Sequence, residues 1–117
     1  MDFSQIEHDL ISEIKLSSLE AKVFLHVTTN GKTTVEKIAK DLNLSYDDSL
    51  IILKKLMELG AFIDISKIEF EAMHPRFTIV NMYRRMCERE NIEFKRNKIV
   101  DNIGVILEMP YDAARTK

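Results

Sequence analysis

The feature that most constrains how this chain folds is a change in the spacing of its apolar residues at Gly60. Before Gly60, apolar residues recur every three or four positions, as they do along one side of an α-helix. Between residues 62 and 72 they alternate with polar residues, as in β-strands. Helical spacing returns from Phe77. The sequence therefore predicts a mostly helical α+β fold with one two-stranded hairpin, whose turn lies at Ser66 and Lys67.

Four helix starts are marked before the hairpin, each by a serine or threonine followed three positions later by an acidic residue. In such a capping box the hydroxyl accepts a hydrogen bond from a backbone N–H of the first helical turn. The four pairs are Ser4–Glu7, Ser17–Glu20, Thr33–Glu36 and Ser45–Asp48. The third predicted helix is short. Asn43 and Leu44 separate it from the fourth, which is expected to end at Gly60.

Two more helices are expected after the hairpin. One is predicted over residues 77–89 and another over residues 91–108, because apolar residues recur there at helical spacing. Residues 92–95 fit an extended segment as well. Met109 and Pro110 are expected to end the last helix, and the residues after them are expected to be frayed.

The succession of a helix, a short helix, a turn, a longer helix and a hairpin is that of a winged helix-turn-helix. Two helices that cross steeply need a small residue at the crossing, and Ala39 meets this need. Leu44 supplies the apolar residue that fills the corner of the turn. We therefore expect a winged helix-turn-helix plus C-terminal helices. Residues 1–90 would be the winged-helix domain with its N-terminal helix. Residues 91–117 would be a C-terminal helix, a possible dimerisation element, and a frayed tail.

Two segments of the chain resemble archaeal TrmB-like transcription regulators. The first is Leu-Ser-Ser-Leu-Glu-Ala-Lys-Val-Phe-Leu at residues 16–25, and the second is residues 34–60. The resemblance covers roughly residues 15–85, and its helix-turn-helix part is similar to MarR- and ArsR-like regulators too. It implies DNA binding by the helix that begins at Ser45, a wing at residues 61–73, and dimerisation through later helices. The sugar-binding domain of longer family members has no counterpart in this sequence, so no sugar ligand is implied.

The expected contacts with double-stranded DNA come from two helix starts, one exposed helix side and the wing. Backbone N–H groups at a helix start favour a phosphate, and lysines add the positive charge on which affinity for DNA largely depends. The predicted contact residues are Thr34, Ser45, Tyr46, Asp47, Ser49, Lys54, Lys55 and Lys67. In a homodimer, two such helices would enter successive major grooves about one turn of DNA apart. These features predict a DNA-binding transcription regulator that is not an enzyme.

The chemistry of the fourth predicted helix leaves another function open. Side chains that read bases in the major groove are usually arginine, lysine, asparagine or glutamine, whereas this helix starts with Tyr46, Asp47 and Asp48. A helical projection places Leu53 inward and Ile51 outward among charged residues. The alternative is therefore a winged-helix protein–protein interaction module of a transcription or assembly complex, with Ile51 at its docking surface.

The C-terminal part carries isoleucines at helical spacing and a run of basic residues. The isoleucines are predicted either to form a dimer interface or to cover the core of their own domain. They are Ile92, Ile99, Ile103 and Ile106. The basic residues are Arg84, Arg85, Arg89, Lys95, Arg96 and Lys98. Because glutamates interrupt this run, we expect a salt-bridged helical surface, with a patch that contacts the DNA backbone as the alternative.

Composition argues against catalysis, metal binding and membrane insertion. The three histidines are scattered and Cys87 is the only cysteine, so the sequence offers no metal-ligand set and no internal disulfide. We expect no cofactor, and a packed structural role for Cys87. Short apolar stretches interrupted by charges predict no membrane span, and an acidic start argues against secretion. The expected location is the cytoplasm, although the net charge of −2 lacks the basic surplus common among DNA-binding proteins.

Overall fold

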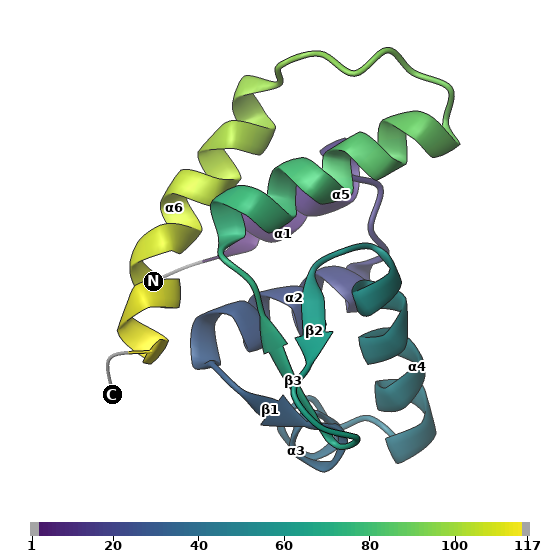
Figure 1. Cartoon of the computed structure of the whole chain (residues 1–117), viewed down its shortest axis with the longest axis vertical. Helices are drawn as coiled ribbons and strands as arrows, with labels where there is room; N and C mark the ends of the chain where they lie inside the picture. Colours follow the sequence, from purple (N-terminus) through teal and green to yellow (C-terminus); the bar gives the residue numbers. More distant parts are fainter. Residues whose placement is uncertain (1–2, 116–117) are drawn as a thin grey trace.

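A computed structural model describes residues 3–115 as six helices and a three-stranded antiparallel sheet (Figure 1). The helices are α1 (Ser4–Glu13), α2 (Ser18–Asn30), α3 (Val35–Asp41), α4 (Tyr46–Glu58), α5 (Pro75–Arg89) and α6 (Lys98–Arg115). The strands are β1 (Thr33–Thr34), β2 (Phe62–Asp64) and β3 (Glu69–Ala72). The predicted α+β class, mostly helical with a hairpin between helices, is therefore confirmed.

The sheet contains one strand more than the sequence predicts. The strand order is β1-β3-β2, and β3 pairs with β2 through Phe62 opposite Ala72. It also pairs with β1 through Thr33 opposite Phe70. The prediction that Thr33 caps the third helix is therefore wrong. Thr34 has this role, since its Oγ1 accepts a hydrogen bond from the backbone N–H of Lys37 at 3.1 Å.

The other capping predictions have mixed outcomes. The Ser17 box is confirmed: Ser17 Oγ accepts from the Glu20 backbone N–H at 3.1 Å, and Glu20 Oε1 accepts from the Ser17 N–H at 2.8 Å. Ser45 Oγ likewise accepts from the backbone N–H of Asp48 at 3.0 Å. The Ser4 box is wrong, because Ser4 is already the first helical residue of α1 and Phe3 occupies the cap position without a side-chain hydrogen bond.

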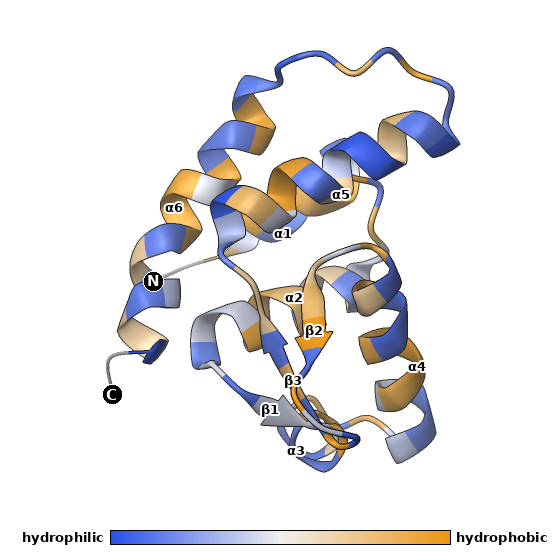
Figure 2. Ribbon diagram, viewed as in Figure 1, coloured by the Kyte–Doolittle hydropathy of each residue, from blue (hydrophilic) through white to orange (hydrophobic). Residues whose placement is uncertain are grey.

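One hydrophobic core connects the helices and the sheet. Phe24 of α2 is fully buried near its centre and stacks on Phe62 of β2, with ring centroids 6.1 Å apart. Val100, Ile103 and Leu107 of α6 belong to the same core. In Figure 2, apolar and polar stretches alternate along α5 and α6, as expected for helices that each bury one side. The C-terminal helix thus shares the core of the rest of the chain.

The C-terminal segment departs from the sequence prediction at both ends. Residues 91–97 form an irregular connection, so α6 begins at Lys98 and the predicted helix over residues 91–97 is wrong. Pro110 lies inside α6, which continues to Arg115. The guanidinium of Arg115 donates to the carbonyl of Ala72 at 2.8 Å and lies 3.4 Å from the centroid of the Tyr111 ring. These contacts hold the end of α6 against β3, where the sequence predicts fraying; residues 116–117 of the predicted tail lie outside the described residues.

Helices α5 and α6 approach closely at Gly104. A Cβ at this position would lie 3.0 Å from Arg76 Cα and 3.4 Å from the carbonyl oxygen of Pro75. Both neighbours are backbone atoms, which cannot move aside without moving α5. Glycine at this position therefore allows α5 and α6 to lie this close together.

The variant Gly104→Val is expected to lower the free energy of unfolding by about 1–3 kcal/mol, because the added side chain forces α5 and α6 apart. Urea denaturation followed by circular dichroism measures the change. Asn102→Val, at an exposed position of the same helix, controls for the effect of a β-branched residue and should stay within about 0.5 kcal/mol of the parent. Equal stability of the two variants would contradict the close approach.

Candidate nucleic-acid interface

Helices α3 and α4 are joined by a tight turn that fixes their relative position. Asn43 has a left-handed backbone conformation, with φ of 55°. The N–H of Leu44 donates to the carbonyl of Ala39 at 2.8 Å, and the Leu44 side chain packs against the core. Leu53 and Leu56 of α4 are fully buried, so α4 is anchored along one side and open to solvent along the other.

The exposed side of α4 carries the charged residues that the helical projection places there. They are Asp47, Asp48, Lys54, Lys55 and Glu58. Ile51 lies among them with 65% of its surface exposed, which confirms its predicted outward position. Ser49 is fully buried, and its hydroxyl donates to the carbonyl of Ser45 at 2.8 Å. The prediction that Ser49 contacts DNA is therefore wrong.

The starts of α3 and α4 and the tip of the β2–β3 hairpin meet on one side of the molecule. Thr34, Tyr46 and Ile68, one from each of these three places, line a small hollow of about 80 Å³. Lys67 is exposed next to Ile68 at the hairpin tip. We call this surface, made of Thr34, the exposed side of α4, and the hairpin tip, the α4 face. In Figure 1 it forms the end of the molecule opposite the loop between α5 and α6.

The hydroxyls at the two helix starts can still donate a hydrogen bond while they act as caps. Thr34 Oγ1 and Ser45 Oγ each accept a backbone hydrogen bond, at 3.1 and 3.0 Å. A hydroxyl that accepts still has a proton to donate, and a phosphate oxygen is a suitable acceptor. The structure thus leaves both residues able to contact an anion at the α4 face.

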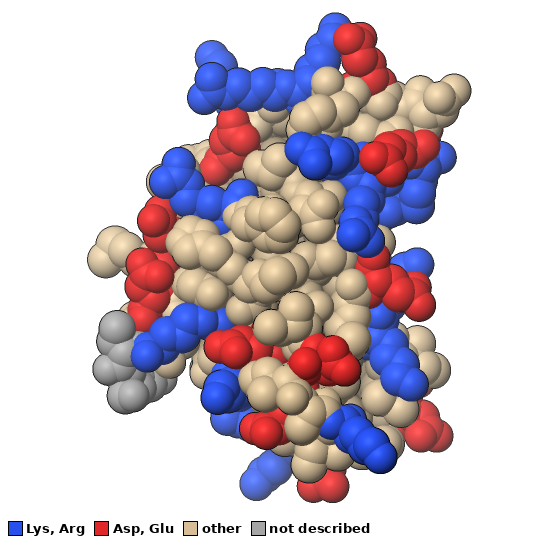
Figure 3. Space-filling model, in the orientation of Figure 1, with Lys and Arg blue, Asp and Glu red and all other residues tan. Residues whose placement is uncertain are grey.

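The charges of the α4 face and its hairpin are mixed. The exposed side of α4 carries two lysines, Lys54 and Lys55, and three carboxylates. The hairpin carries one lysine, Lys67, and the three carboxylates of Asp64, Glu69 and Glu71. Glu71 forms an ion pair with Arg115 Nε at 3.6 Å, which offsets one of these carboxylates. Figure 3 shows basic and acidic side chains side by side at this end of the molecule. An anion would therefore be attracted at the lysines and not over the whole face.

Apolar side chains are more exposed on the hairpin than its alternating pattern indicates. Ile63, Ile65 and Ile68 are all exposed, whereas Phe62, Phe70 and Ala72 are buried. No described element covers these three isoleucines. Ile65 and Ile68 at the hairpin tip, together with Ile51 and Tyr46, give the α4 face an apolar component that the alternation alone does not reveal.

The predicted dimer residues do not form one stripe. Ile103 is fully buried in the core of its own chain, so its prediction as a dimer contact is wrong. Ile92 lies in the connection before α6, while Ile99 is exposed on α6 and Ile106 is half-buried there. The pattern that suggested an interface arises mainly because α6 packs on its own domain.

The basic run forms fewer salt bridges along a helix than expected. The ion pairs of Lys95 with Glu93, at 3.5 Å, and of Arg96 with Asp101, at 3.1 Å, lie in the connection and at the start of α6. Arg84 lies over the ring of Phe94, with its guanidinium carbon 5.0 Å from the centroid. Arg85 donates to the carbonyl of Glu58 and so links α5 to the end of α4.

The remaining candidates are structural. Cys87 is 1% exposed and packed in α5. His26 Nε2 contacts Asp41 Oδ2 at 3.0 Å, which connects α2 to the end of α3. Within residues 3–115 no group of three or more histidine, cysteine, aspartate or glutamate side chains is placed to hold a metal ion. None of the helices described is long and apolar enough to cross a membrane.

Comparison of the chain with protein-family models, with curated proteins and with solved structures gives no match. The case for a function therefore depends on the site itself and on the sequence patterns described above.

Proposed function

We propose that this protein is a winged helix-turn-helix regulator of the TrmB-like kind, which binds double-stranded DNA through its α4 face. The observation that carries the proposal is that the starts of α3 and α4 and the hairpin tip meet at one surface, around Thr34, Tyr46 and Ile68. In this proposal α4 is the recognition helix and the β2–β3 hairpin is the wing.

The dimensions and chemistry of α4 support this proposal. Its 13 residues give a rod about 20 Å long, anchored on one side, and the major groove of B-DNA is about 12 Å wide and admits one helix. Lys54 and Lys55 would contact phosphates on one side of the groove, and Lys67 would contact the backbone beside the wing. Tyr46 and Asp47 lie in the first turn, where a carboxylate can accept a hydrogen bond from cytosine N4.

A homodimer is part of the proposal, because two recognition helices that enter successive grooves bind more tightly than one. The exposed Ile99 and the half-buried Ile106 on α6 are the members of the isoleucine set that remain open to a second subunit. Ile103 has no part in this contact.

Chemical-shift mapping of the ¹⁵N-labelled protein with a mixed-sequence DNA duplex at low ionic strength tests this function. The amides of residues 34–36, 46–55 and 66–68 should shift most. Shifts confined to α5 and α6 would contradict the α4 face as the DNA site, and the absence of shifts would contradict DNA binding.

A second candidate function follows from the exposed isoleucines of the same surface. Ile51, Ile65 and Ile68 would suit a protein partner better than a phosphate backbone. This interaction module would use the α4 face without nucleic acid. An unchanged spectrum in the presence of DNA would favour it over the regulator.

A further inference from the structure

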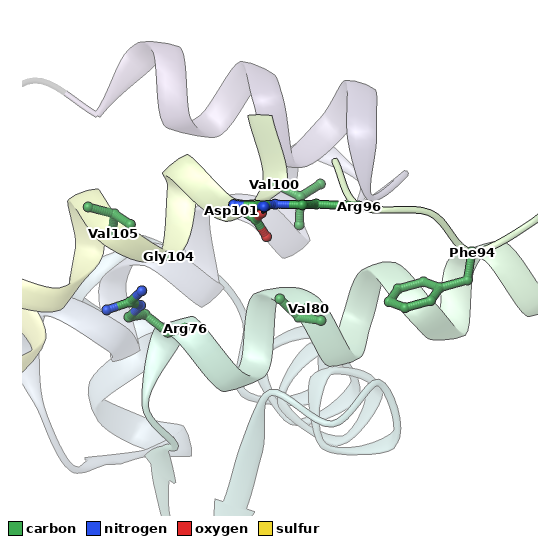
Figure 4. A pocket seen from close by; sticks show the side chains of 8 residues that line it. All are labelled: Arg76, Val80, Phe94, Arg96, Val100, Asp101, Gly104 and Val105. Carbon is green, nitrogen blue, oxygen red and sulfur yellow. The ribbon is translucent and has the colours of Figure 1, made fainter. Parts of the chain in front are cut away.

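A hollow lies far from the α4 face, between α5, α6 and their connection (Figure 4). Its volume is about 530 Å³, within the range of about 300–1,000 Å³ that is usual for small-molecule sites. Val80 of α5, Phe94 of the connection and Val100 of α6 line it. In Figure 4 the side chains of Val80 and Phe94 point towards the space between the two helices.

Two arginines border this hollow. Arg76 comes from the first turn of α5 and Arg96 from the end of the connection, and in Figure 4 the Arg76 side chain points towards Val105 while that of Arg96 ends beside Asp101. Their side chains are 60% and 84% exposed, respectively. In the space-filling view, basic side chains lie at the border of a broad uncharged area over α5, with acidic ones among them (Figure 3).

Both guanidinium groups have N–H donors beyond those used in their contacts with carboxylates. Arg76 Nη1 contacts Glu108 Oε2 at 3.5 Å, which is long for a charged hydrogen bond, and Arg96 Nε donates to Asp101 Oδ2 at 3.1 Å. A guanidinium has five N–H donors, and these contacts use one donor on each arginine. Asp101 also lines the hollow, so the donors that remain free on the two arginines are what a further carboxylate would use.

Apolar side chains that line the hollow are exposed to solvent. Phe94 is 44% exposed and Val105 is 50% exposed, and both border the hollow. The Phe94 ring is held in place by Tyr83, with centroids 5.9 Å apart, and by Arg84 above it. Gly104 leaves the floor without a side chain. A ligand with an apolar body would bury these surfaces, whereas a purely polar anion would not.

We propose that this hollow binds an amphipathic organic anion, a carboxylate with an apolar body of medium length. The carboxylate would be held by Arg76 or Arg96 at the rim, and the apolar body would lie against Val80, Phe94 and Val100. The proposal does not depend on DNA binding, because no residue of the α4 face lines this hollow.

The test uses the whole chain without DNA, with decanoate as probe and isothermal titration calorimetry as readout. Decyltrimethylammonium is the matched probe, because it has the same apolar tail and the opposite charge. Decanoate should bind with a Kd below about 1 mM and at least about tenfold more tightly than the cation, as expected for about 1.4 kcal/mol or more from the charged contacts. Equal binding of the two probes, or no binding of decanoate at this concentration, would overturn the proposal.

Variants identify the site. Arg76→Gln combined with Arg96→Gln should weaken decanoate binding at least about tenfold. The control is Arg89→Gln, an exposed arginine of α5 outside the hollow, which should leave the Kd unchanged. Thermal unfolding establishes that the variants are folded. Binding that is insensitive to the double change, or self-association of the chain that covers the hollow and prevents decanoate binding, would also overturn the proposal.

Discussion

Replacement of Ile103 by aspartate should remove a large part of the stability of the folded chain. Ile103 is fully buried between α6 and the rest of the core, so the variant loses the packing of its side chain and buries a carboxylate without a counter-charge. The expected loss exceeds about 4 kcal/mol, a large part of the roughly 5–15 kcal/mol by which a domain is stable. Far-ultraviolet circular dichroism and urea denaturation measure it.

Ile99→Asp is the matched control on the same helix. Ile99 is exposed, so this change should alter the stability of the folded chain by less than about 1 kcal/mol. If α6 forms the proposed dimer contact, the Ile99 variant should be a folded monomer by light scattering. A folded, monomeric Ile103→Asp variant would instead place Ile103 in an interface and contradict the fold.

Reversal of the two lysines of α4 should have the largest effect on DNA binding. In Lys54→Glu combined with Lys55→Glu, two phosphate contacts become repulsions on a helix that already exposes three carboxylates. We expect a loss of affinity of at least about 100-fold at low salt, or about 2.7 kcal/mol. Fluorescence anisotropy with a labelled duplex measures it.

The matched control is Lys95→Glu combined with Lys98→Glu, which makes the same change in net charge at the opposite end of the molecule. The affinity of this variant for DNA should fall by less than about fivefold, because charges far from the contact are screened by salt. A similar loss in the two variants would mean that only net charge matters, and the α4 face would no longer be supported as the DNA site.

Local chemistry explains which parts of the fold the sequence predicts well. The caps at Ser17 and Ser45 depend on residues three positions away, and the burial of Leu53 and Leu56 depends on helical spacing. Ser49 could have been recognised as buried in the same way, because it lies four residues before Leu53 and seven before Leu56. Its hydroxyl is satisfied by the carbonyl of Ser45, so a polar residue is tolerated there.

The parts that the sequence does not predict depend on distant partners. Strand β1 has two residues, too few to show alternation, and exists because Thr33 and Thr34 pair with β3. The spacing of apolar residues on α6 shows which side is apolar, but it does not show whether that side meets its own domain or a second chain. The helix continues past Pro110, and Arg115 holds its end against β3.

The most direct measurement of the central claim is the salt dependence of binding to a random DNA duplex, followed by fluorescence anisotropy. If Lys54, Lys55 and Lys67 each contact one phosphate, the logarithm of the association constant should fall against the logarithm of salt concentration with a slope of about −2.7 per subunit. For one bound subunit this corresponds to roughly 40-fold weaker binding at about 200 mM than at about 50 mM salt, and for the proposed homodimer the slope doubles to about −5.4. No binding even at the lower salt concentration would contradict the account and leave the α4 face as a surface for a protein partner.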